Sequence, residues 1–332
     1  MKKFLLIILS LFILSLILDC ANKEAAVINE STGVNEKLKE KNKIKIVTTI
    51  YPEYDWLKNI IKGEEDRFDI SILMSSGVDL HNFQPTAKDI LDIWTADLFV
   101  YVGGESDDWA ESAIRQAPNV NLKTINLMAL LKDKVKIEES KEGMEEEEHH
   151  EEEIEYDEHV WLSLKNAMLV CSALENEIEE LDKENEVVYK ENLANYLSEL
   201  TKLDAEYREI VSNAKRKVLL FGDRFPFRYM VEDYGIDYYA AFKGCSAETE
   251  ASFKTIKFLS DKLSEEDIPY VVKIEKSDEK IARAIIENSS KKDASIETMY
   301  SVQAVDKKDI ENGETYLSYM KKNAEVLKKV LN

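Results

Sequence analysis

An acidic stretch at residues 143–162, GMEEEEHHEEEIEYDEHVWL, holds three of the four histidines in the 332-residue chain. Ten acidic residues between Glu145 and Glu158 surround the pair His149–His150. A run of like charges ordinarily forms a solvated loop, so a linker is the simplest interpretation. Imidazoles set among carboxylates can also bind divalent cations loosely and release them quickly. We therefore predict that His149 and His150 belong to an accessory metal-collecting loop at residues 142–158.

His81 and His159 stand in settings that hold their side chains in place. His81 lies in GVDLHNFQPT, residues 77–86, where a proline keeps the short loop apart from the helix predicted to follow. His159 is followed by Val160 and Trp161, whose apolar side chains can anchor the backbone. A lone loop histidine is usually a surface residue or a hydrogen-bonded spacer. Two of them at matching strand-to-helix junctions, separated by a His- and Glu-rich loop, instead predict that both are ligands of one transition metal.

Alternating strands and helices must position these histidines. The first part of the folded chain predicts a parallel sheet with helices on both faces. Its predicted strands cover residues 45–50, 68–73, 98–102 and 120–125. The first predicted helix begins at Pro52, and the others cover residues 86–94, 109–115 and 163–181. Functional loops of such a sheet lie beyond the carboxyl ends of the strands, and His81 follows the second strand directly.

A long helix is predicted at residues 185–216, which contain no proline or glycine and repeat apolar side chains at helical spacing. It would run roughly 45 Å and join two lobes. A coiled coil is the alternative, but the apolar stripe shows no heptads. A second α/β series follows, with strands at 218–221, 238–242, 270–274 and 295–299 and helices at 253–263, 279–289 and 316–331. The predicted fold is α/β, with two (β/α) lobes (residues 44–184 and 217–332) that have parallel sheets and are joined by one long rigid helix.

The start of the chain predicts export. Lys2 and Lys3 precede an apolar run that is short for a membrane span and suited to a signal peptide, here residues 1–19. Cys20 follows directly, at the position where bacterial lipoproteins are acylated, although Asp19 departs from the small residue usual before that cysteine. An uncleaved signal anchor is the alternative. Residues 20–43 are polar and predict a flexible tether between a lipid anchor in the membrane and the folded part.

Charge and cysteine usage narrow the classes of function. The formal net charge of −22 disfavours nucleic-acid binding, which needs a basic face. Cys171 lies in an apolar helical stretch and is expected to be a buried thiol, whereas Cys245 lies in a polar loop. A disulfide between Cys171 and Cys245 is compatible with an oxidising compartment and is left open by the spacing.

The settings of His81 and His159, the latter in DEHVWL at residues 157–162, together with the long helix, resemble the solute-binding proteins of zinc and manganese ABC importers. The resemblance runs from Lys45 to Leu331 and is also carried by Tyr51–Pro52, Gly103–Gly104 and the tail GETYL at residues 313–317. It implies two lobes that grip one metal ion and an extracytoplasmic receptor that delivers the ion to a membrane permease. The His-rich loop favours Zn²⁺, with Mn²⁺ as the alternative.

The second lobe departs from that family. The position where the resemblance places a third ligand is Arg224, and the fourth falls near Ser301–Val302, where no carboxylate stands. A guanidinium is a permanent cation and cannot ligate a metal. Asp223 and Cys245, each at the end of a predicted strand, are therefore the candidate ligands of the second lobe. Asp223 could equally cap a helix or pair with Arg224, and Cys245 could be structural or disulfide-bonded.

These observations predict a binding protein and no enzyme. A zinc hydrolase would need an open coordination position and a general base, as in a His-Glu-x-x-His helix, and neither that motif nor Gly-x-Ser-x-Gly nor a Walker loop occurs. The predicted function is capture of a divalent transition metal outside the cytoplasm, in a protein anchored to the membrane, and its delivery to an ABC permease. The alternative is a surface lipoprotein adhesin whose metal binding is incidental or lost.

Overall fold

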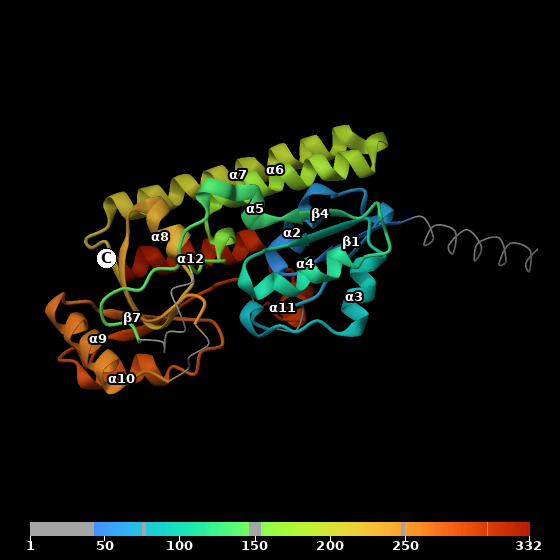
Figure 1. Ribbon diagram of the computed structural model, residues 1–332. Coiled ribbons are helices and arrows are strands. Elements are labelled where there is room, and N and C mark those ends of the chain that lie inside the picture. Colours follow the sequence, from blue (N-terminus) through green and yellow to red (C-terminus); the bar gives the residue numbers. More distant parts are fainter. Residues whose placement is uncertain (1–42, 75–77, 146–153, 247–249, 304) are drawn as a thin grey trace, which may run out of the picture. The chain divides into compact units, whose positions relative to one another are not determined.

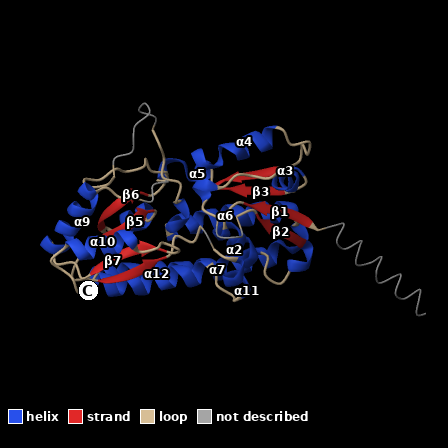
Figure 2. Cartoon of the chain, turned by 90° about the horizontal axis from the view of Figure 1, so that it is seen from below, coloured by secondary structure: helices blue, strands red, loops and turns tan. Residues whose placement is uncertain are grey.

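The strands form two parallel sheets in the computed structural model, which describes residues 43–74, 78–145, 154–246, 250–303 and 305–332. The strand orders are β2-β1-β3-β4 and β6-β5-β7-β8. Figure 2 shows the strands in two separate groups. The strands of the first sheet are β1 (Ile44–Thr48), β2 (Phe68–Ile72), β3 (Leu98–Tyr101) and β4 (Lys123–Asn126), and those of the second are β5 (Val218–Phe225), β6 (Asp237–Lys243), β7 (Tyr270–Ile274) and β8 (Ser295–Met299). The predicted α/β fold with two parallel sheets is confirmed.

Helices alternate with the strands as the sequence predicts. Those of the first half are α2 (Tyr51–Ile60), α3 (Ala87–Trp94), α4 (Asp108–Arg115), α5 (Leu127–Leu131) and α6 (Leu164–Leu181). After α7 (Glu186–Asn213) come α8 (Arg228–Tyr234), α9 (Phe253–Glu265), α10 (Lys280–Asn288), α11 (Lys307–Glu311) and α12 (Tyr316–Val330). The predicted start of a strand at Val120 was wrong: Val120 is 92% exposed, and β4 begins at Lys123. The helices α5, α8 and α11 are too short to show a helical period in the sequence.

The long helix α7 lies beside α6 (Figure 1). The sequence predicted residues 185–216, and the structure gives Glu186–Asn213, which confirms one uninterrupted helix. Its buried face carries Tyr196, Leu200, Leu203 and Tyr207. Each apolar side chain removed from water stabilises the packing by about 1.5–3 kcal/mol, so this stripe fixes which face of α7 turns inward.

The last helix, α12, packs on elements from the first half of the chain, which the sequence did not predict. The Tyr316 hydroxyl donates a hydrogen bond to the carbonyl of Trp161 at 2.6 Å. Its backbone N–H donates to Asp55 of α2 at 3.2 Å. Further along, the Tyr207 hydroxyl of α7 donates to the carbonyl of Met320 at 2.7 Å. The α12 helix therefore joins α2, α7 and the segment just after His159 by buried polar contacts.

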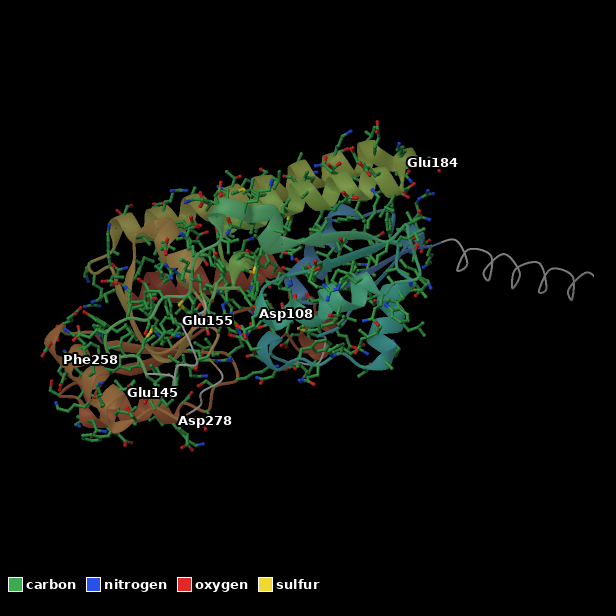
Figure 3. All side chains as sticks on the ribbon, in the orientation of Figure 1. Asp108, Glu145, Glu155, Glu184, Phe258 and Asp278 are labelled. Atoms are coloured by element: carbon green, nitrogen blue, oxygen red, sulfur yellow. The ribbon has the colours of Figure 1, made fainter. Side chains whose placement is uncertain are left out.

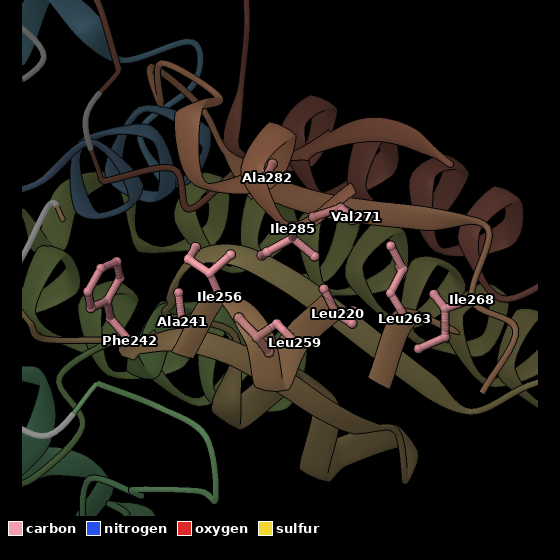
Figure 4. Packing of buried hydrophobic residues seen from close by; sticks show 10 residues of the cluster. All are labelled: Leu220, Ala241, Phe242, Ile256, Leu259, Leu263, Ile268, Val271, Ala282 and Ile285. Carbon is pink, nitrogen blue, oxygen red and sulfur yellow. The ribbon is translucent and has the colours of Figure 1, made fainter. Parts of the chain in front are cut away.

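The second sheet has its own apolar core, in which α9 and α10 pack against β5, β6 and β7 (Figure 4). Its members are fully or almost fully buried: Leu220, Ala241, Phe242, Ile256, Leu259, Leu263, Ile268, Val271, Ala282 and Ile285. Gly222 lies so close to this core that a Cβ at its position would come within 2.6 Å of the Ala282 Cα. A close-packed core of this kind gives the strand ends of the sheet fixed positions.

Strand β5 contains a bulge near its end. Phe221 pairs with Ala240 and Arg224 with Phe242, so three steps on β5 match two steps on β6. One extra residue is thus inserted on β5, which bends the strand and leaves the inserted residues outside the ladder. The bulge lies between Phe221 and Arg224, where the sequence places one of its candidate ligands.

Among the described residues, no helix is long and apolar enough to cross a bilayer. The predicted signal peptide, its Cys20 and the tether up to residue 42 lie outside the described residues. The same holds for His149 and His150. The predicted boundaries between lobes remain predictions.

Candidate metal centre

His81 lies in a short helical turn, Leu80–Asn82, which Asp79 begins by accepting the His81 backbone N–H at 3.1 Å. On the imidazole, Nδ1 lies 2.8 Å from the Ser106 hydroxyl and 3.4 Å from Glu158 Oε2. These contacts hold the ring by its Nδ1 edge. They leave Nε2 facing the other way, which is how a histidine that binds a metal through Nε2 is usually oriented.

His159 is completely buried just before the turn Val160–Leu162. The Asp157 carboxylate accepts its backbone N–H at 2.8 Å and lies 3.0 Å from ring Nδ1. The Trp161 ring packs beside the imidazole, with centroids 5.2 Å apart, and its indole N–H donates to the Ser301 carbonyl at 2.7 Å. A carboxylate on Nδ1 fixes the tautomer that keeps the Nε2 lone pair available.

The two Nε2 atoms of His81 and His159 face one another at 3.3 Å. Tetrahedral zinc with Zn–N bonds of about 2.0–2.1 Å separates two nitrogen ligands by roughly 3.3 Å. The sequence prediction that these two histidines lie together is therefore matched by a spacing that suits a shared ion. His81 comes from the loop after β2 and His159 from the end of the acidic segment, so the chain folds residues 78 positions apart into one pair.

Protonation differs between the two imidazoles. Burial and the neighbouring His159 lower the pKa of His81 to about 3, so His81 is neutral at pH 7. Burial is the largest single influence on His159 and disfavours its imidazolium, but Asp157 together with Glu138 and Glu158 outweighs burial and raises the pKa of His159. A divalent cation between the two Nε2 atoms would compete with a proton there, because metal ligation requires neutral imidazoles.

Cys245 brings a sulfur atom to the histidine pair. Its Sγ and one nitrogen from each of His81 and His159 lie within 4.8 Å of one another. Gly244 makes the approach possible, since a Cβ there would meet the Phe225 carbonyl at 2.9 Å and the His159 ring at 3.3 Å. Burial and nearby carboxylates, Glu138 first, raise the pKa of the Cys245 thiol well above its usual value. The thiol therefore stays protonated at pH 7 until a cation displaces its proton.

Glu138 is a site residue that the sequence analysis missed. Its carboxylate, the Asp157 carboxylate and Cys245 Sγ also lie within 4.8 Å of one another, so Cys245 belongs to two groupings at once. Glu138 stands in KIEES, residues 136–140, which has no recognisable motif. The only signal in the sequence is that it precedes the acidic stretch, and an acid at such a place is ordinarily solvated.

Asp223 lies outside both groupings of described residues. Its Oδ1 accepts the backbone N–H of Arg224 at 2.8 Å, and its Oδ2 accepts that of Ile274 on β7 at 3.2 Å. Asp223 thus bridges two neighbouring strands at the bulge, where β5 and β7 have left their ladder. These contacts are with backbone N–H groups and are neither of the predicted alternatives, a helix cap or an ion pair with the Arg224 guanidinium, which pairs with Asp79.

Arg224 stands where the family resemblance placed a ligand, and it binds protein groups instead. Its Nη2 lies 2.5 Å from Asp79 Oδ2, and its Nη1 donates to the Ser246 carbonyl at 3.2 Å. The Asp79 carboxylate also accepts the Gln303 amide N–H at 3.0 Å. A cation at this position is thus neutralised beside His81 and does not enter the ligand set.

The second departure, at Ser301–Val302, is filled by a carboxylate from another strand end. Glu275 accepts the Ser301 backbone N–H and hydroxyl at 2.7 Å each and the Val302 N–H at 3.1 Å. Val302 has φ 63°, a strained value for a β-branched residue, and the Glu275 contacts hold it there. Both Glu275 oxygens are therefore used in hydrogen bonds to this turn. Burial raises the pKa of Glu275.

The thiols of Cys171 and Cys245 are both free. Cys171 is fully buried in α6, as its apolar neighbours predicted. The disulfide that the sequence left open is absent between these two described residues. The Cys245 thiol is therefore available to bind a metal.

The fold has two parallel sheets with helices, and a long helix stands between them in the chain. The site has two facing histidines at loop positions and a thiol that follows a strand of the second sheet. Together they define the two-lobed class of metal-dependent solute-binding proteins. The chain belongs to the family described as zinc-uptake complex component A, periplasmic, whose model matches residues 46–330. The predicted resemblance is confirmed.

Two named relatives are a zinc uptake protein and a zinc-binding protein. The chain is 30% identical over 329 residues to the high-affinity zinc uptake system protein ZnuA of Bacillus subtilis, covering 95% of this chain and 96% of that protein. It is 28% identical over 298 residues to the zinc-binding protein AdcA of Streptococcus pyogenes, covering 86% of this chain but 56% of AdcA. The chain thus spans little more than half the length of that relative.

A solved structure has the same fold. The crystal structure of the Zn(II)-bound ZnuA-like domain of Streptococcus pneumoniae AdcA matches with a TM-score of 0.69 and 25% sequence identity. The match covers 87% of this chain and 99% of that domain.

Proposed function

We propose that this protein is an extracytoplasmic receptor that captures Zn²⁺ and delivers it to the membrane permease of an ABC importer. The observation that carries the proposal is the 3.3 Å separation of the facing Nε2 atoms of His81 and His159, with Cys245 Sγ beside them. Imidazole and thiolate ligands suit zinc, and the two imidazole nitrogens already have the spacing of a tetrahedral site. The names of the relatives, a zinc uptake protein and a zinc-binding protein, support the same cargo.

The donor set argues for zinc over manganese. Manganese prefers oxygen ligands in an octahedral arrangement, whereas nitrogen and thiolate ligands select zinc. Two imidazoles and a sulfur leave room for one oxygen at most in a four-coordinate site. Zinc is therefore the cargo and Mn²⁺ the weaker competitor.

Delivery requires binding and release, and no bond in a substrate is made or broken. The protein is thus a receptor and not an enzyme. Export by residues 1–19 and acylation at Cys20 would hold it at the membrane beside its permease. The family description, a periplasmic component of a zinc-uptake complex, supports that location and partner.

The test is zinc titration of the mature protein in competition with a chelator of known affinity. Replacing both His81 and His159 by Ala is expected to weaken tight binding by more than about 100-fold, because loss of partners that merely orient ligands already costs 10–100-fold. The matched control replaces the other two histidines, His149 and His150, by Ala and keeps the tight site. Equal tight binding by the two double variants would refute the proposal.

A further inference from the structure

Glu138 lies where the chain before the acidic loop, residues 142–158, pairs with the chain near the end of that loop. Ile137 and Tyr156 form an antiparallel bridge, in which the Glu138 N–H donates to the Glu155 carbonyl and the Asp157 N–H to the Lys136 carbonyl, each at 2.9 Å. Glu138 is thereby set beside Asp157, two residues before His159. Figure 3 labels Glu145 and Glu155, which lie before and after positions 146–153 in the chain.

The Glu138 side chain reaches the loop that carries the thiol. Its Oε1 accepts the Gly244 N–H at 2.8 Å and the Cys245 N–H at 3.4 Å. Its Oε2 lies 3.7 Å from Cys245 Sγ. Oxygen and sulfur ligands of one tetrahedral zinc lie roughly 3.5 Å apart. One oxygen of Glu138 is thus held by backbone donors and the other faces the sulfur at ligand spacing.

The other nearby carboxylates have different partners. Asp157 Oδ1 is bound to both nitrogens of His159, its backbone N–H and ring Nδ1. Glu158 lies at Nδ1 of His81, the ring edge opposite the Nε2 that faces His159. These two carboxylates support the imidazoles from behind. Asp157 also lies within 4.8 Å of Cys245 Sγ, but its Oδ1 is already bound to His159.

Charge balance also favours a carboxylate beside the thiolate. Two neutral imidazoles and one thiolate leave a bound divalent cation with one uncompensated positive charge. His159 is fully buried and His81 nearly so, and an unpaired charge in such surroundings is costly. One carboxylate ligand makes the centre neutral.

We propose that Glu138 is the fourth zinc ligand, binding through Oε2 and completing a site of two imidazoles, a thiolate and a carboxylate. This inference rests on the proposed zinc-receptor function and adds the ligand that closes the site. It also makes the base of the acidic loop at residues 142–158 part of the metal centre, because Glu138 precedes that loop and His159 follows it.

The test compares Glu138→Gln with Glu139→Gln in the mature protein. Glu139 is the adjacent acid, whose carboxylate accepts the Tyr238 hydroxyl at 2.9 Å, and it serves as the matched control. Gln at position 138 keeps an acceptor for the Gly244 N–H but loses the anionic ligand. Zinc affinity is expected to fall by more than about 10-fold for Glu138→Gln, because loss of a group that only orients a ligand already costs 10–100-fold, and to stay unchanged for Glu139→Gln. The melting temperature of each variant without metal checks that both remain folded.

Cobalt spectroscopy separates a ligand from a positioning residue. With Co²⁺ in place of Zn²⁺, Glu138→Gln should keep the sulfur-to-cobalt charge-transfer band and change the visible d–d bands, since only the oxygen ligand is exchanged. Unchanged d–d bands, or zinc affinity equal to that of Glu139→Gln, would overturn the role of Glu138 while leaving the receptor function intact. Tight zinc binding by the His81→Ala, His159→Ala variant would refute the receptor function itself.

Discussion

Arg224 and Asp79 form an ion pair in which Nη2 lies 2.5 Å from Oδ2. Asp79 uses its other oxygen to accept the His81 backbone N–H, so one carboxylate connects a cation on β5 with the turn that carries the His81 imidazole. Burial disfavours the Asp79 carboxylate, but Arg224 and His81 outweigh burial and lower its pKa. The residue that stands where the resemblance places a ligand thus helps to position the His81 imidazole.

Replacing Arg224 by Met is expected to lower the free energy of unfolding by about 1–3 kcal/mol, because it leaves the largely buried Asp79 carboxylate without its cation. Urea denaturation of the metal-free protein measures the change. Lys88→Met removes an exposed ion pair with Asp92 and should leave the unfolding midpoint unchanged. Equal effects of the two replacements would contradict a structural role for Arg224.

Cys245→Ser should abolish the sulfur-to-cobalt charge-transfer band and weaken zinc binding, since a neutral hydroxyl replaces a thiolate. The absorption spectrum of the Co²⁺-loaded protein is the measurement. Cys171→Ala is the control, because Cys171 is the other free thiol and lies fully buried in α6. A band that survives in Cys245→Ser or disappears in Cys171→Ala would show that the sulfur ligand is misassigned.

Replacing residues 146–153 by a short Gly-Ser linker should reduce the number of weakly bound zinc ions and leave the tight site unchanged. The reason is that the backbone hydrogen bonds of Glu138 and Asp157, at 2.9 Å each, close the base of the segment without those residues. Isothermal titration calorimetry resolves the two classes of site. Loss of tight binding would mean that the replaced residues are part of the main site.

Asp55→Asn should alter how stability depends on pH. Burial raises the pKa of Asp55 from 3.8 to about 6, so between these values the folded protein holds a proton that the unfolded chain has released. Stability contributed by this group is therefore complete below about pH 4 and is lost as the pH rises through 6, a change of about 3 kcal/mol. Asn does not titrate, so the free energy of unfolding of the variant, relative to that of the native protein, should rise by about that amount between pH 4 and 7. A difference that does not vary with pH in urea denaturation would contradict this assignment.

The sequence predicted the parts of this protein whose signals are local. β-Branched runs and helical periodicity located the two sheets and the long helix, because burial of one face imposes its period on the chain. The paired histidines were found because their neighbours are distinctive: a proline after His81 and an aromatic after His159. Cys245 was a candidate because it follows a strand.

The remaining site residues depend on contacts that leave no local pattern. Glu138 enters the site through a bridge between Ile137 and Tyr156, residues separated by the acidic run. Asp223 was placed among the candidates by its position at a strand end, but the bulge in β5 turns its carboxylate to the Ile274 N–H. A single extra residue in a strand changes which side chains share a face, and no composition or spacing rule reveals it.

That bulge gives β5 one residue more than its pairing with β6 requires. Three steps on β5 match two on β6, so deleting one residue between Phe221 and Arg224 would let the two strands pair step for step, with Arg224 still opposite Phe242. Phe225 would stay stacked on Tyr238, where the ring centroids are 3.6 Å apart. The surplus residue would be lost at the place where the Asp223 carboxylate accepts the Ile274 N–H. The one extra residue therefore serves the link between β5 and β7, and the pairing of β5 with β6 does not depend on it.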